Sequence, residues 1–231
     1  MLIRDIQPSL IEWDGFLTNI VFTYGCNWRC RYCFQRDLLK QPDRLISEDK
    51  VIEKLEYDKD RFGINHIEII GGEPTIYRDL SDFVKELFNK GFRIMIATNG
   101  SNPEVIDDLL SYVDFWAVDY KTTFDKYSDL IRKPFDKNKY LESVRLIHKS
   151  NYIIRTTYLK GYHDDLLQQM AKELCEFTDA NHYHVQQGLY QNTLDPSFKF
   201  EDSTSMEAET FETKIKKEME AICGKISHKN I

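Results

Sequence analysis

Three cysteines lie close together near the start of the chain. Cys26, Cys30 and Cys33 have the spacing CxxxCxxC, which brings three thiolates into one short loop. Iron–sulfur clusters prefer thiolate ligands. A [4Fe–4S] cluster on three cysteines keeps one iron without a protein ligand, and such an open position can bind and activate a substrate. The spacing therefore predicts a [4Fe–4S] cluster here. The alternative is a zinc site, which usually needs a second cysteine or histidine pair that this chain lacks.

Two further features accompany these cysteines. An aromatic residue, Tyr32, precedes the last cysteine, and Gly71, Gly72, Glu73 and Pro74 follow a strand-like run. With them the chain resembles the radical S-adenosylmethionine (SAM) superfamily. The resemblance implies that SAM binds the open iron and is cleaved to a 5′-deoxyadenosyl radical. It also implies that Tyr32 lies near the adenine and that the GGEP segment contacts the methionine amino group. Taken alone, the GGEP segment is better explained by an ordinary strand-to-helix turn, and a packed aromatic ring explains Tyr32 as well as a contact to adenine does.

Polar residues end two further strand-like runs, and a third run carries an arginine. Thr98 and Asn99 precede a glycine, a common turn pattern. Alternation places Asp119 and Lys121 on one face of the next run, away from its apolar residues. Arg155 lies on a run expected to line a barrel, where a guanidinium needs an anionic partner. The resemblance favours contacts to SAM or to a cation, and the alternative is pairing among the charges themselves.

The elements that must position these residues alternate between strand-like and helix-like runs. This alternation predicts an α/β fold with parallel strands, a partial (β/α)6 TIM-like barrel in one domain covering 1–231. Ligands of such folds bind where the strands end, which is where every motif above lies. Strands are expected over 17–24, 66–70, 93–98, 114–120, 152–158 and 182–187, and helices over 47–57, 80–89, 103–110, 138–150, 164–177 and 205–222.

Other candidate residues carry less information. On the sixth strand, His184 and Gln186 are expected to face the interior, without an assigned role. Cys175 lies in a helical apolar pattern and is expected in the core, while Cys223 follows a charged helix. The odd cysteine count makes a disulfide framework unexpected, and two scattered cysteines do not predict a second cluster.

Composition narrows the function classes. The formal net charge of -7 argues against binding nucleic acid through a broad basic surface. No apolar run approaches the roughly 20 residues that cross a bilayer, and the N-terminus does not resemble a signal peptide. We therefore expect no membrane association and a cytoplasmic location.

A closer resemblance extends over most of the chain. Segments similar to the activating proteins of anaerobic ribonucleoside-triphosphate reductase lie at 9–15, 98–105, 155–157, 185–187 and 193–196. This resemblance implies that the radical removes a hydrogen from a glycine of a class III ribonucleotide reductase or another glycyl radical enzyme. It also implies an electron donor such as flavodoxin or ferredoxin. The alternatives are a small-molecule enzyme related to 7-carboxy-7-deazaguanine synthase and a non-enzymatic iron–sulfur or zinc-binding module.

Overall fold

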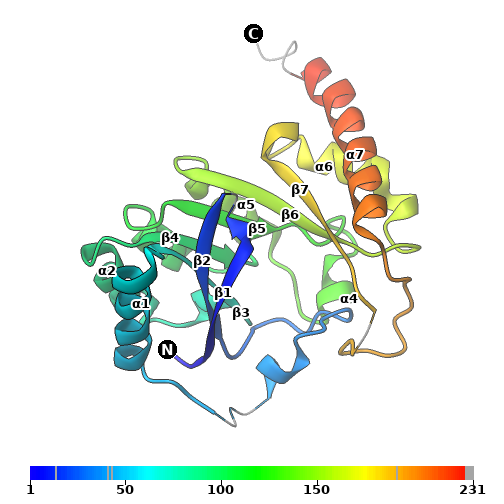
Figure 1. The fold of residues 1–231 in the computed structure, drawn as a ribbon. Coiled ribbons are helices and arrows are strands. Elements are labelled where there is room, and N and C mark those ends of the chain that lie inside the picture. Colours follow the sequence, from blue (N-terminus) through cyan, green and yellow to red (C-terminus); the bar gives the residue numbers. More distant parts are fainter. Residues whose placement is uncertain (14, 41, 43, 191, 227–231) are drawn as a thin grey trace. The chain divides into compact units, whose positions relative to one another are not determined.

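Seven strands lie in the order β1 to β7, each beside the next (Figure 1). The computed structural model describes residues 1–13, 15–40, 42, 44–190 and 192–226, so Asp14 of the 9–15 segment lies outside the described residues. The strands are β1 (Ile3–Trp13), β2 (Phe16–Thr23), β3 (His66–Gly71), β4 (Arg93–Thr98), β5 (Phe115–Asp119), β6 (Asn151–Tyr158) and β7 (Tyr183–Gln187). The helices are α1 (Glu48–Phe62), α2 (Leu80–Asn89), α3 (Pro103–Leu109), α4 (Tyr127–Ile131), α5 (Lys137–Ile147), α6 (Leu167–Leu174) and α7 (Ser205–Ile226).

The chain divides into two compact units. Unit 1 comprises Met1–Asn27, Gln35–Ala117 and Glu142–Tyr152. Unit 2 comprises Trp28–Phe34, Val118–Leu141 and Ile153–Ile231. The prediction of one radical SAM domain over 1–231 is not tested by this division and stays a prediction. No helix among the described residues is both long and apolar enough to cross a membrane.

The expected alternation of strands and helices is confirmed, because each of β2 to β7 is followed by at least one helix. The bounds differ in detail. Helix α1 continues to Phe62 rather than 57 and ends at Gly63, whose φ of 72° lies in the left-handed region that favours glycine. The short helix α4 was not predicted, since five residues are too few to show a helical period.

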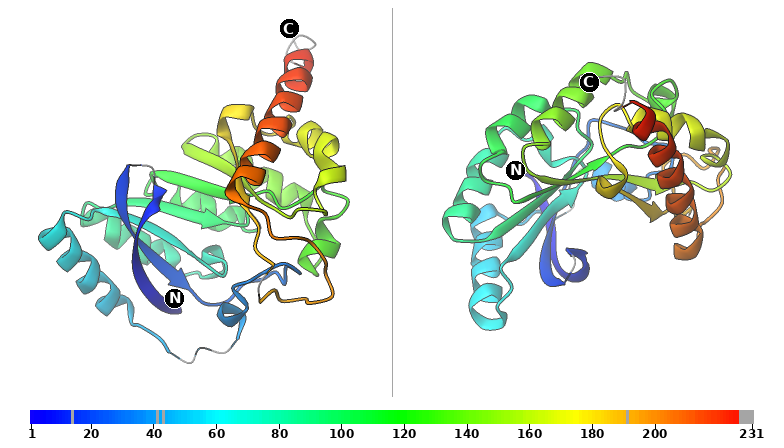
Figure 2. Two further views of the ribbon diagram at one scale, coloured as in Figure 1. Left: turned by 45° about the vertical axis from the view of Figure 1, so that its right-hand side comes forward. Right: turned by 90° about the horizontal axis from the view of Figure 1, so that it is seen from above.

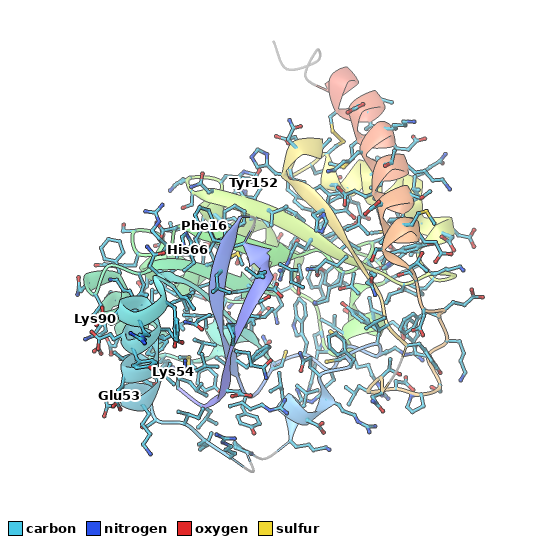
Figure 3. The ribbon with its side chains drawn as sticks, in the orientation of Figure 1. Phe16, Glu53, Lys54, His66, Lys90 and Tyr152 are labelled. Atoms are coloured by element: carbon cyan, nitrogen blue, oxygen red, sulfur yellow. A yellow bond between two sulfur atoms is a disulfide. The ribbon has the colours of Figure 1, made fainter. Side chains whose placement is uncertain are left out.

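Strand β1 is a further difference from the expected six strands. It pairs antiparallel with β2 and forms one edge of the sheet. Its sequence has no clean alternation and contains Pro8, which an edge strand tolerates because one side of its backbone needs no partner. At the end of this hairpin Phe16 stacks on His66 with ring centroids 4.0 Å apart (Figure 3). Trp13 meets the same imidazole edge-on at 4.8 Å.

Unit 1 is built on parallel pairing of β2 with β3 and of β3 with β4. The register aligns Val21 with Ile69 and Ile69 with Ile96, so one face of these strands is continuously apolar. Figure 2 shows the helices of this unit along one side of its strands. The side chains that the helices bury include Val51, Leu55, Phe83 and Leu87. Each such side chain stabilises the fold by roughly 1.5–3 kcal/mol.

Unit 2 contains the parallel pair of β6 and β7, with α6 packed on α7 (Figure 2). Its core is rich in aromatic rings. Tyr127 stacks on Phe135 with centroids 3.9 Å apart, and Phe124 stacks on the same ring at 5.9 Å. Tyr120, directly after β5, joins this cluster edge-on to Phe124. Tyr120 is therefore part of the aromatic core of unit 2.

Candidate active site

The cysteine loop begins in unit 1 and continues in unit 2, with Cys26 in the first and Cys30 and Cys33 in the second. None of the three forms a disulfide. The chain itself shapes the loop, since the Gly25 N–H donates to the Leu38 carbonyl at 2.7 Å and the Cys33 N–H donates to the Cys30 carbonyl at 3.0 Å. Hydrogen bonds within unit 1 therefore hold the backbone beside Cys26, and hydrogen bonds within unit 2 hold that of Cys30 and Cys33.

Cys30 is the most buried of the three. Burial raises the pKa of its thiol to about 11, against the opposing effect of the Lys121 ammonium. Only the thiolate ligates iron, so binding a metal would release a proton from Cys30.

The paired glycines after β3 allow two backbones to touch. A Cβ on Gly72 would lie 1.7 Å from the Gly25 carbonyl oxygen, and one on Gly71 would lie 2.4 Å from that of Thr23. The Gly72 N–H donates to Thr23 at 3.0 Å and the Glu73 N–H donates to Gly25 at 2.8 Å. The glycines thus bring the end of β3 against the segment that enters the cysteine loop.

The carboxylate of Glu73 is buried and joins two segments of unit 1. Its Oε1 accepts from the Thr75 hydroxyl at 2.6 Å and from the Thr98 hydroxyl at 2.7 Å, and its Oε2 accepts from the Asn99 N–H at 2.6 Å. Burial raises the pKa of Glu73, while these donors oppose the rise. Pro74 begins the 3-10 turn Pro74–Ile76 directly after it. Glu73 therefore joins the end of β3 to the end of β4.

Asn27 links this network to the cysteine loop, and sequence reasoning missed it. Its Oδ1 accepts from Asn99 Nδ2 at 2.9 Å, and its Nδ2 donates to Ser101 Oγ at 2.7 Å. The same Oδ1 lies 3.9 Å from the Cys26 sulfur. Its position between two cysteines was the available signal. Thr98 and Asn99 are thus brought together with Glu73 and with the residue beside Cys26.

A second group of predicted residues meets in unit 2. Lys121 Nζ donates to Asp119 Oδ2 at 2.8 Å, and Arg155 Nη2 lies 3.6 Å from the other carboxylate oxygen. Burial alone would raise the pKa of Asp119, but these two cations hold it below its usual range. Lys121 also lies 5.9 Å from the ring centroids of Tyr32 and Trp28. The charge pairing that the sequence left as the alternative is present, and Lys121 also lies near the aromatic residue of the cysteine loop. Contacts of these residues to SAM stay a prediction.

His163 supports this group and carried no sequence signal. It is fully buried, its Nδ1 accepts from the Leu159 N–H at 3.0 Å, and its Nε2 lies 3.1 Å from the Lys121 carbonyl. These contacts require a neutral ring protonated at Nε2. Tyr127 holds the same turn, because its hydroxyl accepts from the Lys121 N–H at 2.8 Å. The backbone of Lys121 is thereby fixed on both sides.

The register of β6 and β7 places His184 beside Arg155 and Gln186 beside Thr157. His184 and Gln186 therefore share the face of Arg155. The imidazole of His184 is about half exposed and pairs with Glu212 of α7 at 2.9 Å. His184 therefore has a structural partner on α7, and the structure assigns it no further role.

Cys175 and Cys223 correct an expectation, because they form a disulfide within unit 2. The bond ties the residue after α6 to the last turns of α7. The odd total of five cysteines concealed it, although setting aside the three of the loop leaves an even pair.

Comparison with known proteins identifies the class. Residues 20–174 match the family described as the Radical SAM superfamily. The match covers more than half of the chain, and the chain belongs to this superfamily. It is a radical SAM enzyme, which contradicts the non-enzymatic module considered from the sequence.

Two curated relatives show which radical SAM enzymes this chain is similar to. A Methanocaldococcus jannaschii protein with the provisional name glycyl-radical enzyme activating enzyme is 32% identical over 84% of this chain and 82% of its own length. The 7-carboxy-7-deazaguanine synthase of Aquifex aeolicus is 33% identical over 39% of this chain and 42% of its own length.

Solved structures of low sequence identity share the fold. TYW1 with a lysine–pyruvate adduct superposes with a TM-score of 0.60, at 20% identity over 88% of this chain and 73% of that chain. Streptococcus suis SuiB bound to S-adenosylmethionine gives 0.61, at 16% identity over 94% of this chain and 50% of that chain. The predicted α/β partial-barrel fold class is confirmed.

Membership also confirms the predicted cofactors, a [4Fe–4S] cluster and S-adenosylmethionine. The donor set fits the cluster, because the loop offers three thiols outside any disulfide. Among the described residues, however, no three or more His, Cys, Asp or Glu side chains are placed so that they could hold a metal ion together, and this includes the three cysteines. The assignment of Cys26, Cys30 and Cys33 as ligands therefore stays a prediction.

Proposed function

We propose that this chain is a glycyl-radical enzyme activating enzyme and that its partner is an anaerobic, class III ribonucleotide reductase. The observation that carries the proposal is the 32% identity to the M. jannaschii protein of that provisional name, which extends over 84% of this chain and 82% of the relative. A likeness of this extent covers the parts outside the shared superfamily match at 20–174 as well. The segments at 185–187 and 193–196, which resemble reductase activating proteins, support the choice of reductase.

The proposal gives each predicted site residue a task. Cys26, Cys30 and Cys33 bind the cluster, and Tyr32 lies against the adenine of SAM. With one electron from flavodoxin or ferredoxin, the bound cluster and SAM would supply a 5′-deoxyadenosyl radical and release methionine. This radical would take one hydrogen atom from a glycine Cα, giving 5′-deoxyadenosine and the glycyl radical. The protein's part is to place and shield this chemistry.

The remaining residues bind the methionine portion of SAM, which carries an ammonium and a carboxylate. The backbone of Gly71 to Pro74, with Thr98 and Asn99 beside it, is proposed to contact the ammonium. Glu73 acts indirectly, because its carboxylate oxygens already accept from Thr75, Thr98 and Asn99. Lys121 and Arg155 offer cations to the carboxylate, and Asp119 holds both cations in place.

The test is an anaerobic EPR spectrum of the reconstituted, reduced protein mixed with SAM and the class III reductase of its host. We expect a glycyl radical doublet on the reductase that is absent without SAM and absent with Cys30→Ala. An intact cluster that cleaves SAM without producing the doublet would overturn the choice of partner. Mapping the radical by mass spectrometry of oxygen-cleaved reductase would identify the glycine.

A small-molecule substrate is the second candidate. Its support is the similarity to 7-carboxy-7-deazaguanine synthase, which reaches only 39% of this chain. This reading predicts that a small molecule stimulates formation of 5′-deoxyadenosine in the absence of any protein partner. Stimulation by the reductase alone would exclude it.

A further inference from the structure

The segment between β7 and α7 closes on itself. The Ser203 N–H donates to the Gly188 carbonyl at 3.1 Å, and the Gly188 N–H donates to the Ser203 hydroxyl at 2.9 Å. The residues between these two ends, 189–190 and 192–202 as described, have no regular strand or helix. We call residues 188–190 and 192–203 the strap. Its two ends are held together by these two hydrogen bonds.

The middle of the strap bonds to the cysteine loop within unit 2. The Leu194 N–H donates to the Cys33 carbonyl at 2.9 Å, and the Asp195 N–H donates to the Arg31 carbonyl at 2.9 Å. Alternate residues of the loop thus accept from consecutive residues of the strap. One of these acceptors belongs to a predicted cluster ligand.

The side chain of Arg31 adds further contacts between the cysteine loop and the strap. Its Nε donates to Asp195 Oδ2 at 2.9 Å and its Nη1 to Asp129 Oδ2 at 3.1 Å. The guanidinium carbon lies 4.7 Å from the ring centroid of Phe198 in the strap. The Asp195 side chain is only 11% exposed. An aspartate so placed needs a cation, and a planar guanidinium can meet two carboxylates and one ring together.

Asp195 is itself held in position. Its Oδ1 accepts from the Ser197 N–H at 3.0 Å, and the Phe198 N–H donates to its carbonyl at 3.1 Å. This turn points Phe198 at Arg31. The hydrogen bond from the Ser197 hydroxyl and the charge of Arg31 hold the pKa of Asp195 at about 2, so it is an anion at every working pH.

We propose that Arg31 and Asp195 are a positioning pair that docks the strap on the cysteine loop and fixes the backbone between Cys30 and Cys33. The inference rests on the proposed ligation by these cysteines. Arg31 lies between the two ligands, so its two carboxylate contacts restrain the main chain of both. No local sequence pattern pairs Arg31 with Asp195, since the two residues lie 164 positions apart.

The test compares Arg31→Ala, Arg31→Lys and Asp195→Asn with a matched control, Arg132→Asn. Arg132 also approaches Asp195, at 3.8 Å, but its side chain is 57% exposed. Its φ of 53° suits asparagine, so the control adds little backbone strain. The readouts are limited proteolysis of the metal-free protein, mapped by mass spectrometry, and the rate of iron release from the reconstituted protein to bipyridyl.

We expect Arg31→Ala and Asp195→Asn to speed cleavage within the strap and iron release by about tenfold or more, the effect of losing one charge-assisted contact. Arg31→Lys should restore part of the protection, because lysine keeps the positive charge. Restoration should be incomplete, because an ammonium cannot donate to two carboxylates in the planar geometry of a guanidinium. Arg132→Asn should stay within about twofold of the parent. If Asp195→Asn folds and releases iron at the parental rate, the proposal is wrong. The rates of proteolysis and of iron release are measured without a partner protein. If the parent protein produced no glycyl radical on the reductase, only the activase assignment would be refuted, and the present proposal would still be tested by these rates.

Discussion

Gly72 shows how one hydrogen atom in place of a side chain decides the geometry of the candidate site. The position has ordinary backbone angles but no room, since a Cβ would lie 1.7 Å from the Gly25 carbonyl oxygen. Gly72→Ala must push two backbones apart, and we expect it to lower the free energy of unfolding by about 3 kcal/mol. Urea denaturation of the metal-free variant measures this loss, and the iron bound after reconstitution should fall as well.

Gly63→Ala is the matched control for Gly72→Ala. It has a φ of 72° and no atom within 4 Å of the added Cβ, so only backbone strain is introduced. That strain costs about 1–2 kcal/mol and should leave iron binding unchanged. Equal iron contents in the two variants would show that the close approach at Gly72 does not shape the cysteine loop.

His163 makes stability depend on pH. Burial lowers the pKa of this imidazole to about 4, from an ordinary value of 6.5. Above pH 6.5 the ring is neutral in both the folded and unfolded chains. Between pH 6.5 and 4 only the unfolded chain takes up the proton, so the free energy of unfolding falls as the pH is lowered. The total loss from this residue is about 3 kcal/mol.

The measurement is urea denaturation of the metal-free protein at several pH values for the parent and His163→Asn. Asparagine keeps an acceptor for the Leu159 N–H and does not titrate in this range. His66 also has a lowered pKa, so both proteins lose some stability with acid. The parent should lose more by about 3 kcal/mol between pH 6.5 and 4. Parallel curves for the two proteins would contradict a neutral buried His163.

Only part of the site could be predicted from residue types. The cysteine spacing carried a signal of its own, and the two glycines carried one only in combination with it, because both patterns lie in short stretches of sequence. Asn27, His163 and Asp195 act through partners distant in the sequence, as when Asn27 meets Asn99. No local sequence pattern predicts such a contact, since it forms only when segments distant in the sequence meet in the fold.

At the scale of elements, the disulfide between Cys175 and Cys223 joins α6 to α7 across 48 residues of sequence. Closing a loop of this length restricts the unfolded chain, which stabilises the fold by about 4 kcal/mol in the chain-entropy model. We expect Cys223→Ser to lose most of this stabilisation. Denaturation of the metal-free protein without reductant measures the loss.

The parent protein treated with a phosphine reductant provides the control for Cys223→Ser. Reduction should bring its unfolding midpoint down to that of the variant and should leave the variant unchanged. A parent whose midpoint is insensitive to the reductant would mean that the two sulfurs are not bonded in solution.

The elements themselves were largely predictable. Six strands and their following helices were recognised because a strand buried by helices is short and rich in β-branched residues. Strand β1 was missed because it is an edge strand with Pro8 and partly exposed faces, which removes the alternating pattern. The aromatic core around Tyr127 and Phe135 could not be foreseen, since its rings come from segments without a shared period.

At the scale of the whole molecule, we expect the fold not to depend on the cluster. The cores of unit 1 and unit 2 are built from apolar and aromatic side chains, and the loop backbone is bonded to protein, as in Arg29 N–H to the Ile131 carbonyl at 2.9 Å. We therefore expect removal of iron by a chelator to abolish SAM cleavage but to leave the helical circular dichroism signal within about a tenth of its starting value. A small zinc-bound domain would instead unfold when its metal is removed.

Both properties are measured on one anaerobic sample, SAM cleavage as 5′-deoxyadenosine formed and helix content as ellipticity. Reconstitution with iron and sulfide should restore SAM cleavage. Loss of the helical signal together with the iron would show that the cluster is needed to hold the fold as well as to carry out the reaction.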